Sequence, residues 1–169
     1  MEEGFDLIAS LLKWVHVNLV IIFIIGIAGY INYFYQAARE TNIKVVHDMV
    51  EMGDKIHKYF LFWGGILLIL SGIVTALRHN VPILGFLAGG EVNWLLASNI
   101  LLLTYFPLMS LIFIPRHKVF HRELENAIIK EEVTQGLRNA FKGRAIKNGH
   151  IYELAIVMII IFLMVVKPF

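Results

Sequence analysis

The chain contains no cysteine. It therefore has no disulfide framework, no thiolate zinc site and no cysteine-ligated iron–sulfur cluster. Charged residues are also scarce, at 17% of 169 residues, whereas a soluble domain averages about 25%. The formal net charge of +2 is too small to indicate nucleic-acid binding. The sequence shows no motif for nucleotide binding, hydrolysis or a Ser/His/Asp triad, and no inverted repeat of the kind found in transporters.

The start of the chain lacks the basic region of a cleaved signal peptide. Its first residues are acidic instead, with Glu2, Glu3 and Asp6 before the first apolar run. We therefore expect that apolar run to be retained as a membrane span.

Four long apolar segments cover about residues 8–36, 59–78, 93–115 and 150–167. A helix needs about 20 apolar residues to cross a bilayer. No alternating strand pattern is present, and only helices and closed barrels satisfy every backbone polar group in lipid. The sequence therefore predicts an all-α fold, a transmembrane four-helix bundle in which residues 1–169 form a single integral membrane domain.

Basic residues are unevenly distributed among the connections. Four lie between the first and second segments and eight between the third and fourth, so that Lys13, Arg78 and Lys167 remain for the other side. Because basic residues concentrate on the cytoplasmic side, we predict that both long connections are cytoplasmic. Both termini would then lie outside, in the inner membrane of a bacterium or archaeon.

Both long connections have the apolar spacing of helices. Residues 43–57 predict a helix that extends the first span into the cytoplasm. Residues 117–147 predict a long amphipathic helix on the membrane or against the base of the bundle. Its apolar stripe consists of Phe120, Leu124, Ile128, Leu137 and Phe141. Pro107 should kink the third span, and Pro115 should mark a further bend.

Small residues follow one face of the second span. Gly65, Gly72 and His79 are seven residues apart and share this face, while His57, Gly64 and Ser71 share the adjoining one. Small residues let helices approach closely in lipid. Alternatively, the missing side chains make room for a flat macrocycle with an axial imidazole, such as haem.

Histidine is the residue type here that is best suited to bind a cofactor or a metal ion, since an ionisable side chain in a span indicates a functional site. His16 and His79 lie towards the outer side and could ligate one haem iron between them. His57, with His117 or His121, could ligate an inner haem or a metal ion. His117 and His121 are four residues apart, a spacing that suits zinc or copper.

Ordinary roles are the alternatives for these polar side chains. His16 could make an interhelical hydrogen bond, and the interfacial histidines could simply be solvated. Glu153, near the start of the fourth span, could carry protons or pair with Lys58 or Arg116.

The segment Lys13–Val17, followed by a span that contains Gly26 and Gly29, resembles the opening helix of a group of small bacterial membrane proteins. This group includes the HemJ-type protoporphyrinogen oxidases and the CopD-like copper-resistance domains. The resemblance continues through Ser71–Ile73 and Ile114–Arg116 and covers about residues 11–120. In HemJ-type proteins a histidine of the first span is implicated in b-type haem, and His16 is its match here. The resemblance thus implies a haem or copper role.

The leading hypothesis is an integral membrane protein that binds one or two b-type haems. It would transfer electrons alone or as a subunit of a membrane oxidoreductase, between quinone and a redox partner protein. The alternatives are a cofactor-free structural or assembly subunit, and a protein that handles copper or another metal through its cytoplasmic histidines. A second copy of the chain could complete the bundle.

Overall fold

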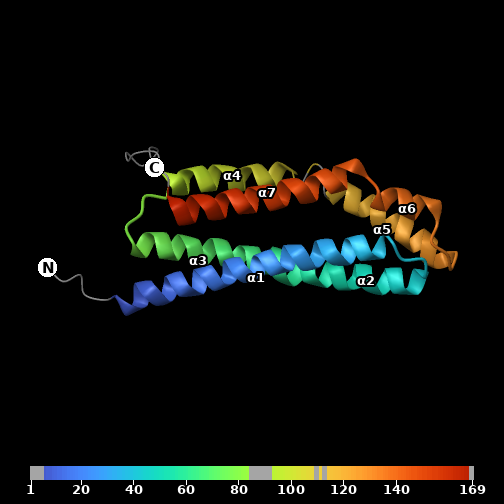
Figure 1. Ribbon diagram of the computed structural model, residues 1–169, viewed down its shortest axis with the longest axis horizontal. Coiled ribbons are helices and arrows are strands. Elements are labelled where there is room, and N and C mark those ends of the chain that lie inside the picture. Colours follow the sequence, from blue (N-terminus) through green and yellow to red (C-terminus); the bar gives the residue numbers. More distant parts are fainter. Residues whose placement is uncertain (1–5, 84–92, 109–110, 112–113, 168–169) are drawn as a thin grey trace.

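The computed structural model describes residues 6–83, 93–108, 111 and 114–167, and the elements in these ranges are helices (Figure 1). They are α1 (Leu7–Ala37), α2 (Ile43–Ile56), the π-helical η1 (His57–Trp63), α3 (Gly64–Arg78), α4 (Trp94–Leu108), α5 (Ile114–Ile129), α6 (Gln135–Phe141) and α7 (Arg144–Val166). The prediction of an all-α fold is confirmed.

Among the residues that the structure describes, three helical stretches are long and apolar enough to cross a membrane. They are Leu7–Ala37, the continuous α2–η1–α3 stretch Ile43–Arg78, and Gln135–Val166. The third predicted span corresponds to α4, whose apolar part, Trp94–Tyr105, is shorter. Three predicted spans are therefore present as candidate membrane helices, while the complete four-span bundle stays a prediction.

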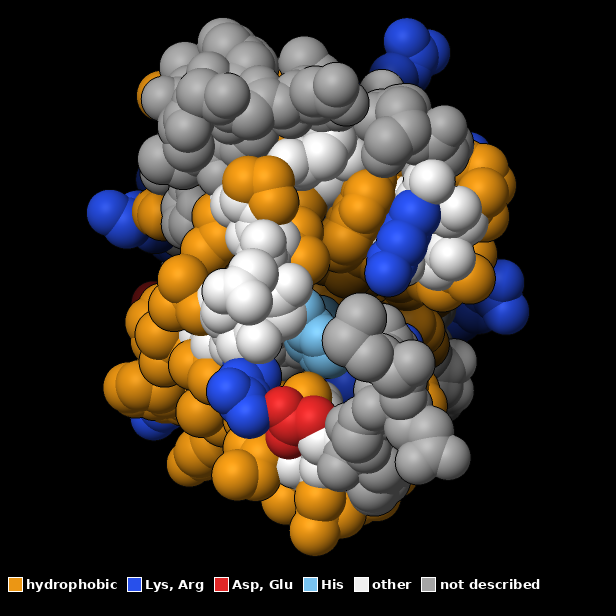
Figure 2. Space-filling view, turned by 90° about the vertical axis from the view of Figure 1, so that its left-hand side faces the viewer, with side chains coloured by type: hydrophobic (Ala, Val, Ile, Leu, Met, Phe, Trp, Pro, Cys, Tyr) orange, Lys and Arg blue, Asp and Glu red, His pale blue; other side chains and the backbone are white. Residues whose placement is uncertain are grey.

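The molecule is elongated, and its two ends differ (Figure 1). The start of α1 and the end of α7 lie at one end, whereas α2, α5 and α6 lie at the other. The two basic connections thus share one end, as the charge distribution predicts. Figure 2 looks onto the opposite end, where apolar side chains cover much of the visible surface. There an ion pair between Asp6 and Arg78 joins the start of α1 to the end of α3.

The buried core lies at the α5–α6 end. Apolar side chains along the spans are largely exposed, as lipid-facing residues are, whereas residues from α1, α2, α5 and α6 form one buried cluster. Its members are Phe34, Ala37, Ile43, Val46, Val50, Phe120, Leu124, Ala127, Leu137 and Phe141. The predicted stripe of residues 117–147 therefore packs against the helices, although Ile128 is exposed.

Two predicted connections are built differently from expectation. The helix over residues 43–57 continues into the second span and not from the first. Its start is set by Asn42, whose side chain accepts a hydrogen bond from the Lys44 amide, while the Glu40 carboxylate accepts bonds from the amides of Thr41 and Asn42. These bonds favour a turn over a continuous helix.

The segment 117–147 is likewise not one helix. α5 ends at Ile129, and Glu131 takes a left-handed conformation with φ of 56°. Thr134 then caps α6 by accepting a hydrogen bond from the Leu137 amide. α7 begins at Arg144, six residues before the predicted start of the fourth span. The chain reverses here because two helices, unlike one, can fold their apolar faces onto the same core.

Glycine sets the closest approach between α1 and η1. A Cβ atom on buried Gly26 would lie 2.5 Å from Phe60 Cβ and 3.1 Å from Leu61 Cδ1. Since Phe60 Cβ is fixed to the backbone, no change of rotamer relieves the first contact. One turn later, a Cβ on Gly29 would meet Ile56 Cδ1 at 3.6 Å, an ordinary contact.

We therefore expect Gly26→Ala to push α1 away from η1 and to destabilise the protein by about 1–3 kcal/mol, the usual cost of overpacking. Gly29→Ala is the matched control and should be neutral or slightly stabilising, because alanine in a helix interior is more favourable than glycine by up to about 1 kcal/mol of folding free energy. Thermal unfolding in detergent measures both. Equal stability of the two variants would show that the α1–η1 contact is not limited by Gly26.

Candidate metal centre

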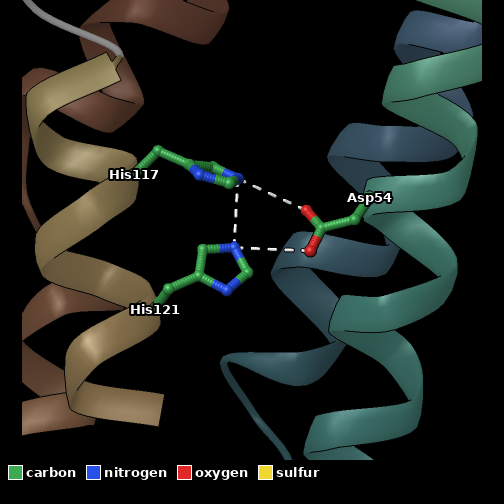
Figure 3. A group of neighbouring side chains, drawn as sticks. All are labelled: Asp54, His117 and His121. Carbon is green, nitrogen blue, oxygen red and sulfur yellow. Dashed lines mark hydrogen bonds and ion pairs between the residues drawn. The ribbon is translucent and has the colours of Figure 1, made fainter. Parts of the chain in front are cut away.

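Three potential metal ligands converge where α2 meets α5. Figure 3 shows Asp54 of α2 pointing towards His117 and His121 of α5. The Nε2 atoms of the two histidines are 3.1 Å apart. Asp54 Oδ1 lies 3.4 Å from His117 Nε2, and Asp54 Oδ2 lies 3.3 Å from His121 Nε2. All three side chains thus offer a ligand atom to the same small volume.

The fold of each helix explains this convergence. α2 buries Val46, Val50 and Gly53, which places the next residue, Asp54, at the edge of its buried face. α5 buries Phe120 and Leu124. His117 and His121 each precede one of these by three residues and so project from the same side of α5. The hydrophobic contact of α2 with α5 therefore also brings the polar side chains together.

The distances match a coordination polyhedron. A metal with bonds of about 2.1 Å in a tetrahedron keeps its ligand atoms about 3.4 Å apart. The two Nε2 atoms are 3.1 Å apart, and each of them has a different oxygen of the Asp54 carboxylate at 3.4 or 3.3 Å, so each of these pairs is spaced close to this value. Two imidazoles and one carboxylate could therefore hold an ion with little rearrangement and leave a fourth position for water or another ligand.

The candidate metal centre is partly accessible to water. His117, Asp54 and His121 expose 52%, 36% and 33% of their side chains, respectively. Burial and the neighbouring His117 lower the pKa of His121 below its ordinary 6.5, although the Asp54 carboxylate opposes them. The His117–His121 hydrogen bond also needs one ring nitrogen as acceptor. Both effects favour the neutral imidazole, which is the form that binds metals.

A cavity of about 40 Å³ adjoins the metal centre. Asp54, Arg116 and His117 line it on the α2–α5 side, and Tyr30 and His150 line it from α1 and α7. The other side chains in its lining are apolar and belong to Phe34, Met49, Val50, Phe120 and Ile146. The candidate metal centre therefore adjoins a mainly apolar space that carries a few polar groups and extends towards the membrane-spanning helices.

His16 makes an interhelical hydrogen bond in the other half of the molecule. Its Nδ1 lies 2.9 Å from Ser71 Oγ, and the same hydroxyl donates to the Leu68 carbonyl at 2.9 Å. A serine hydroxyl has a single proton. It must therefore accept from His16 Nδ1–H, so that His16 Nε2 keeps a lone pair.

Neighbouring side chains fill the row of small residues on α3. A Cβ on Gly72 would lie 3.1 Å from His16 Cε1, and one on Gly65 would lie 3.3 Å from Phe23 Cε2. These glycines thus admit side chains of α1, as close helix packing requires. His79 follows the last residue of α3 and is exposed. It lies eight residues after Ser71, or about 12 Å further along a helix axis, so the structure does not bring His79 and His16 together.

His57 lies beside the candidate metal centre and is not part of it. It begins η1, one turn after Asp54, and its ring packs against Tyr30 with centroids 5.5 Å apart. Sequence reasoning predicted the pair His117 and His121 but missed Asp54. The available signal was the spacing of Asp54 and His57, three residues apart on one helix, which places a carboxylate next to a histidine already under consideration.

A family model described as a predicted integral membrane protein (DUF2269) matches residues 10–168. No curated protein and no solved structure matches the chain. The resemblance to HemJ-type and CopD-like proteins therefore stays a prediction.

Without metal, the lowered pKa of His121 makes stability depend on pH. The unfolded chain binds a proton at this residue near pH 6.5, whereas the folded protein binds it only at lower pH. Stability is therefore full above 6.5 and falls as the pH drops below that value. We expect His121→Gln to reduce this acid sensitivity in thermal unfolding with a chelator present. An unchanged pH profile in this variant would contradict the assignment.

Proposed function

The chain belongs to the DUF2269 family of predicted integral membrane proteins, and we propose that its function is to bind a divalent transition-metal ion at Asp54, His117 and His121. The observation that carries this proposal is the convergence of the three side chains: the two histidine Nε2 atoms lie 3.1 Å apart, and each has one oxygen of the Asp54 carboxylate within 3.4 Å. Imidazole and carboxylate together suit Zn²⁺, Cu²⁺ and Fe²⁺, whereas Mg²⁺ and Ca²⁺ prefer oxygen ligands alone.

The open fourth position favours a role in metal handling or metal chemistry over a purely structural role, because structural zinc sites use four protein ligands. The positive-inside rule supports a cytoplasmic location for this end of the molecule, since most of the basic residues of the chain lie in its connections. A metal bound there would be exchanged with the cytoplasm, next to the cavity that leads towards α1 and α7.

Metal titration of the detergent-purified protein tests this proposal. We expect one high-affinity equivalent of Zn²⁺, Cu²⁺ or the spectroscopic probe Co²⁺. Asp54→Asn, His117→Ala and His121→Ala should each reduce the metal affinity by at least about 10–100-fold, because the loss of a residue that only supports a ligand already has a cost of this size. Affinity should also fall at acid pH, where protons compete with the metal for the imidazole nitrogens.

His47→Ala is the matched control. His47, Asp48 and Glu51 form a second, more exposed group on α2, in which Lys55 already pairs with Glu51 at 2.6 Å. This variant should bind metal like the unmodified protein. If His47→Ala abolished metal binding and His117→Ala did not, the metal would be assigned to the exposed group and the proposal would be wrong.

A second candidate function is the binding of b-type haem for electron transfer, with quinone and a redox protein as partners. Its supporting observation is the ring orientation of His16, since hydrogen bonding through Nδ1 leaves Nε2 for iron, as in many metal-ligating histidines. Its weakness is space, because the His16 and Phe23 rings occupy the positions beside Gly72 and Gly65. The metal centre is therefore the better supported proposal.

A reduced-minus-oxidised absorption spectrum separates the two functions. A sharp α-band that disappears in His16→Ala would establish the haem, and Ser71→Ala should then shift its potential because the ligand loses its hydrogen-bond partner. Bound metal without an α-band supports the centre at Asp54. A protein with neither would be a structural or assembly subunit.

A further inference from the structure

A carboxyl group is buried inside the third candidate span. Glu153 of α7 is only 4% exposed, and the Tyr105 hydroxyl of α4 donates a hydrogen bond of 2.8 Å to its Oε1. Burial of an ionisable group at membrane depth is costly and marks proton or ion pathways. One hydrogen bond from a neutral hydroxyl does not offset the charge of a carboxylate in such a place.

Aromatic and polar side chains connect Glu153 to the α5–α6 end. His150, one turn earlier on α7, is 3% exposed and packs edge-on against Tyr30, with ring centroids 5.7 Å apart. Tyr30 and His150 line one cavity together with Asp54, whose carboxylate is partly exposed. This cavity therefore connects the turn of α7 before Glu153 to the carboxylate at the molecular surface.

The cavity of about 40 Å³ covers part of this distance. Tyr30 and His150 form its inner wall, and Asp54, Arg116 and His117 form its outer wall. It exceeds the roughly 10–15 Å³ that one water molecule needs. Most of its lining is apolar, and these five side chains supply its hydrogen-bonding groups. Water in this cavity would reach from the metal centre to Tyr30 and His150.

We propose that Glu153 is a proton-binding site that exchanges protons with water at the α5–α6 end through Tyr30 and this cavity. A proton from water adds to Oε2 and turns the carboxylate into a neutral acid, while Tyr105 continues to donate to Oε1. Release returns the proton along the same route. The titratable and charged groups on this route are Tyr105 of α4, Tyr30 of α1, Asp54 of α2, Arg116 and His117 of α5, and His150 of α7 itself.

The alternative is a purely structural role, in which Glu153 only joins α7 to α4 by its bond with Tyr105. The two roles differ in whether the carboxyl proton of Glu153 exchanges with water. A structural acid keeps one protonation state and is closed to solvent, whereas a proton-binding site gains and loses its proton while the protein stays folded. This proposal does not depend on metal binding at Asp54, since the route needs only the cavity.

Infrared spectroscopy of the full chain in lipid vesicles tests the proposal. We expect a C=O stretching band of a protonated carboxylic acid that is lost in Glu153→Gln and decreases as the pH rises. Tyr105→Phe should shift this band, because its carbonyl loses a hydrogen bond. Transfer to D₂O should shift it too, since the proton exchanges. If Glu153→Gln fails to fold, ¹³C-labelled glutamate in the unmodified chain assigns the band to a glutamate, and Glu153 is the glutamate that is buried among the described residues.

Tyr30→Phe and Tyr152→Phe form a matched pair that tests the route. The Tyr152 hydroxyl bonds to Thr104, 2.8 Å away, and lies outside the cavity. We expect Tyr30→Phe to slow the exchange in D₂O and Tyr152→Phe to leave it at the original rate. A Glu153 band that does not change with pH or D₂O, or equal exchange rates in both tyrosine variants, would overturn the proposal.

Discussion

The packing of Phe34 into the core at the α5–α6 end is the contact on which the rest of the structure depends. Its ring lies 5.7 Å from that of Phe120, 5.1 Å from that of Phe141 and 5.3 Å from that of His150. One side chain of α1 therefore touches α5, α6 and α7. The hydrophobic effect stabilises a contact only where apolar surface would otherwise be exposed to water and not to lipid. It can therefore hold the helices together in this core. The core also fixes α5 against α2, and with it the distance between Asp54 and the two histidines.

Different forces act along the spans, where lipid is as apolar as the side chains. Helices associate there through close packing and interhelical hydrogen bonds. α1 meets η1 at Gly26 and α3 at Gly72, and the His16–Ser71 bond joins the same pair of helices. α7 meets α4 through Tyr105–Glu153 and Tyr152–Thr104. Local polar contacts thus hold α1 to α3 and α7 to α4, and the core around Phe34 joins the first pair to the second.

The sequence predicts well what depends on length and apolarity. The first span is expected at residues 8–36 and found at Leu7–Ala37, and the His117–His121 pair follows from helical spacing alone. The same reasoning fails where the local conformation of a few residues interrupts a helix. Asn42 detaches the helix of residues 43–57 from the first span, and Glu131 breaks the amphipathic segment. Asp54 was missed for a third reason: its partners are 63 and more residues away in the chain, and only the packing of α2 on α5 brings them within reach.

The polar side chains are placed differently in the two halves of the molecule. In the half that holds the chain ends, His16 is hydrogen-bonded to Ser71, and rings of α1 fill the places beside Gly65 and Gly72, so that the polar group there serves helix packing. In the other half, α2 supplies Asp54 and α5 supplies His117 and His121, and these partly exposed side chains meet beside a cavity. Tyr30, one turn before Phe34 on α1, forms part of the wall of this cavity. The contact that holds the core therefore also sets the position of the tyrosine between the proposed metal and the buried carboxyl, and both sites depend on the same turn of one helix.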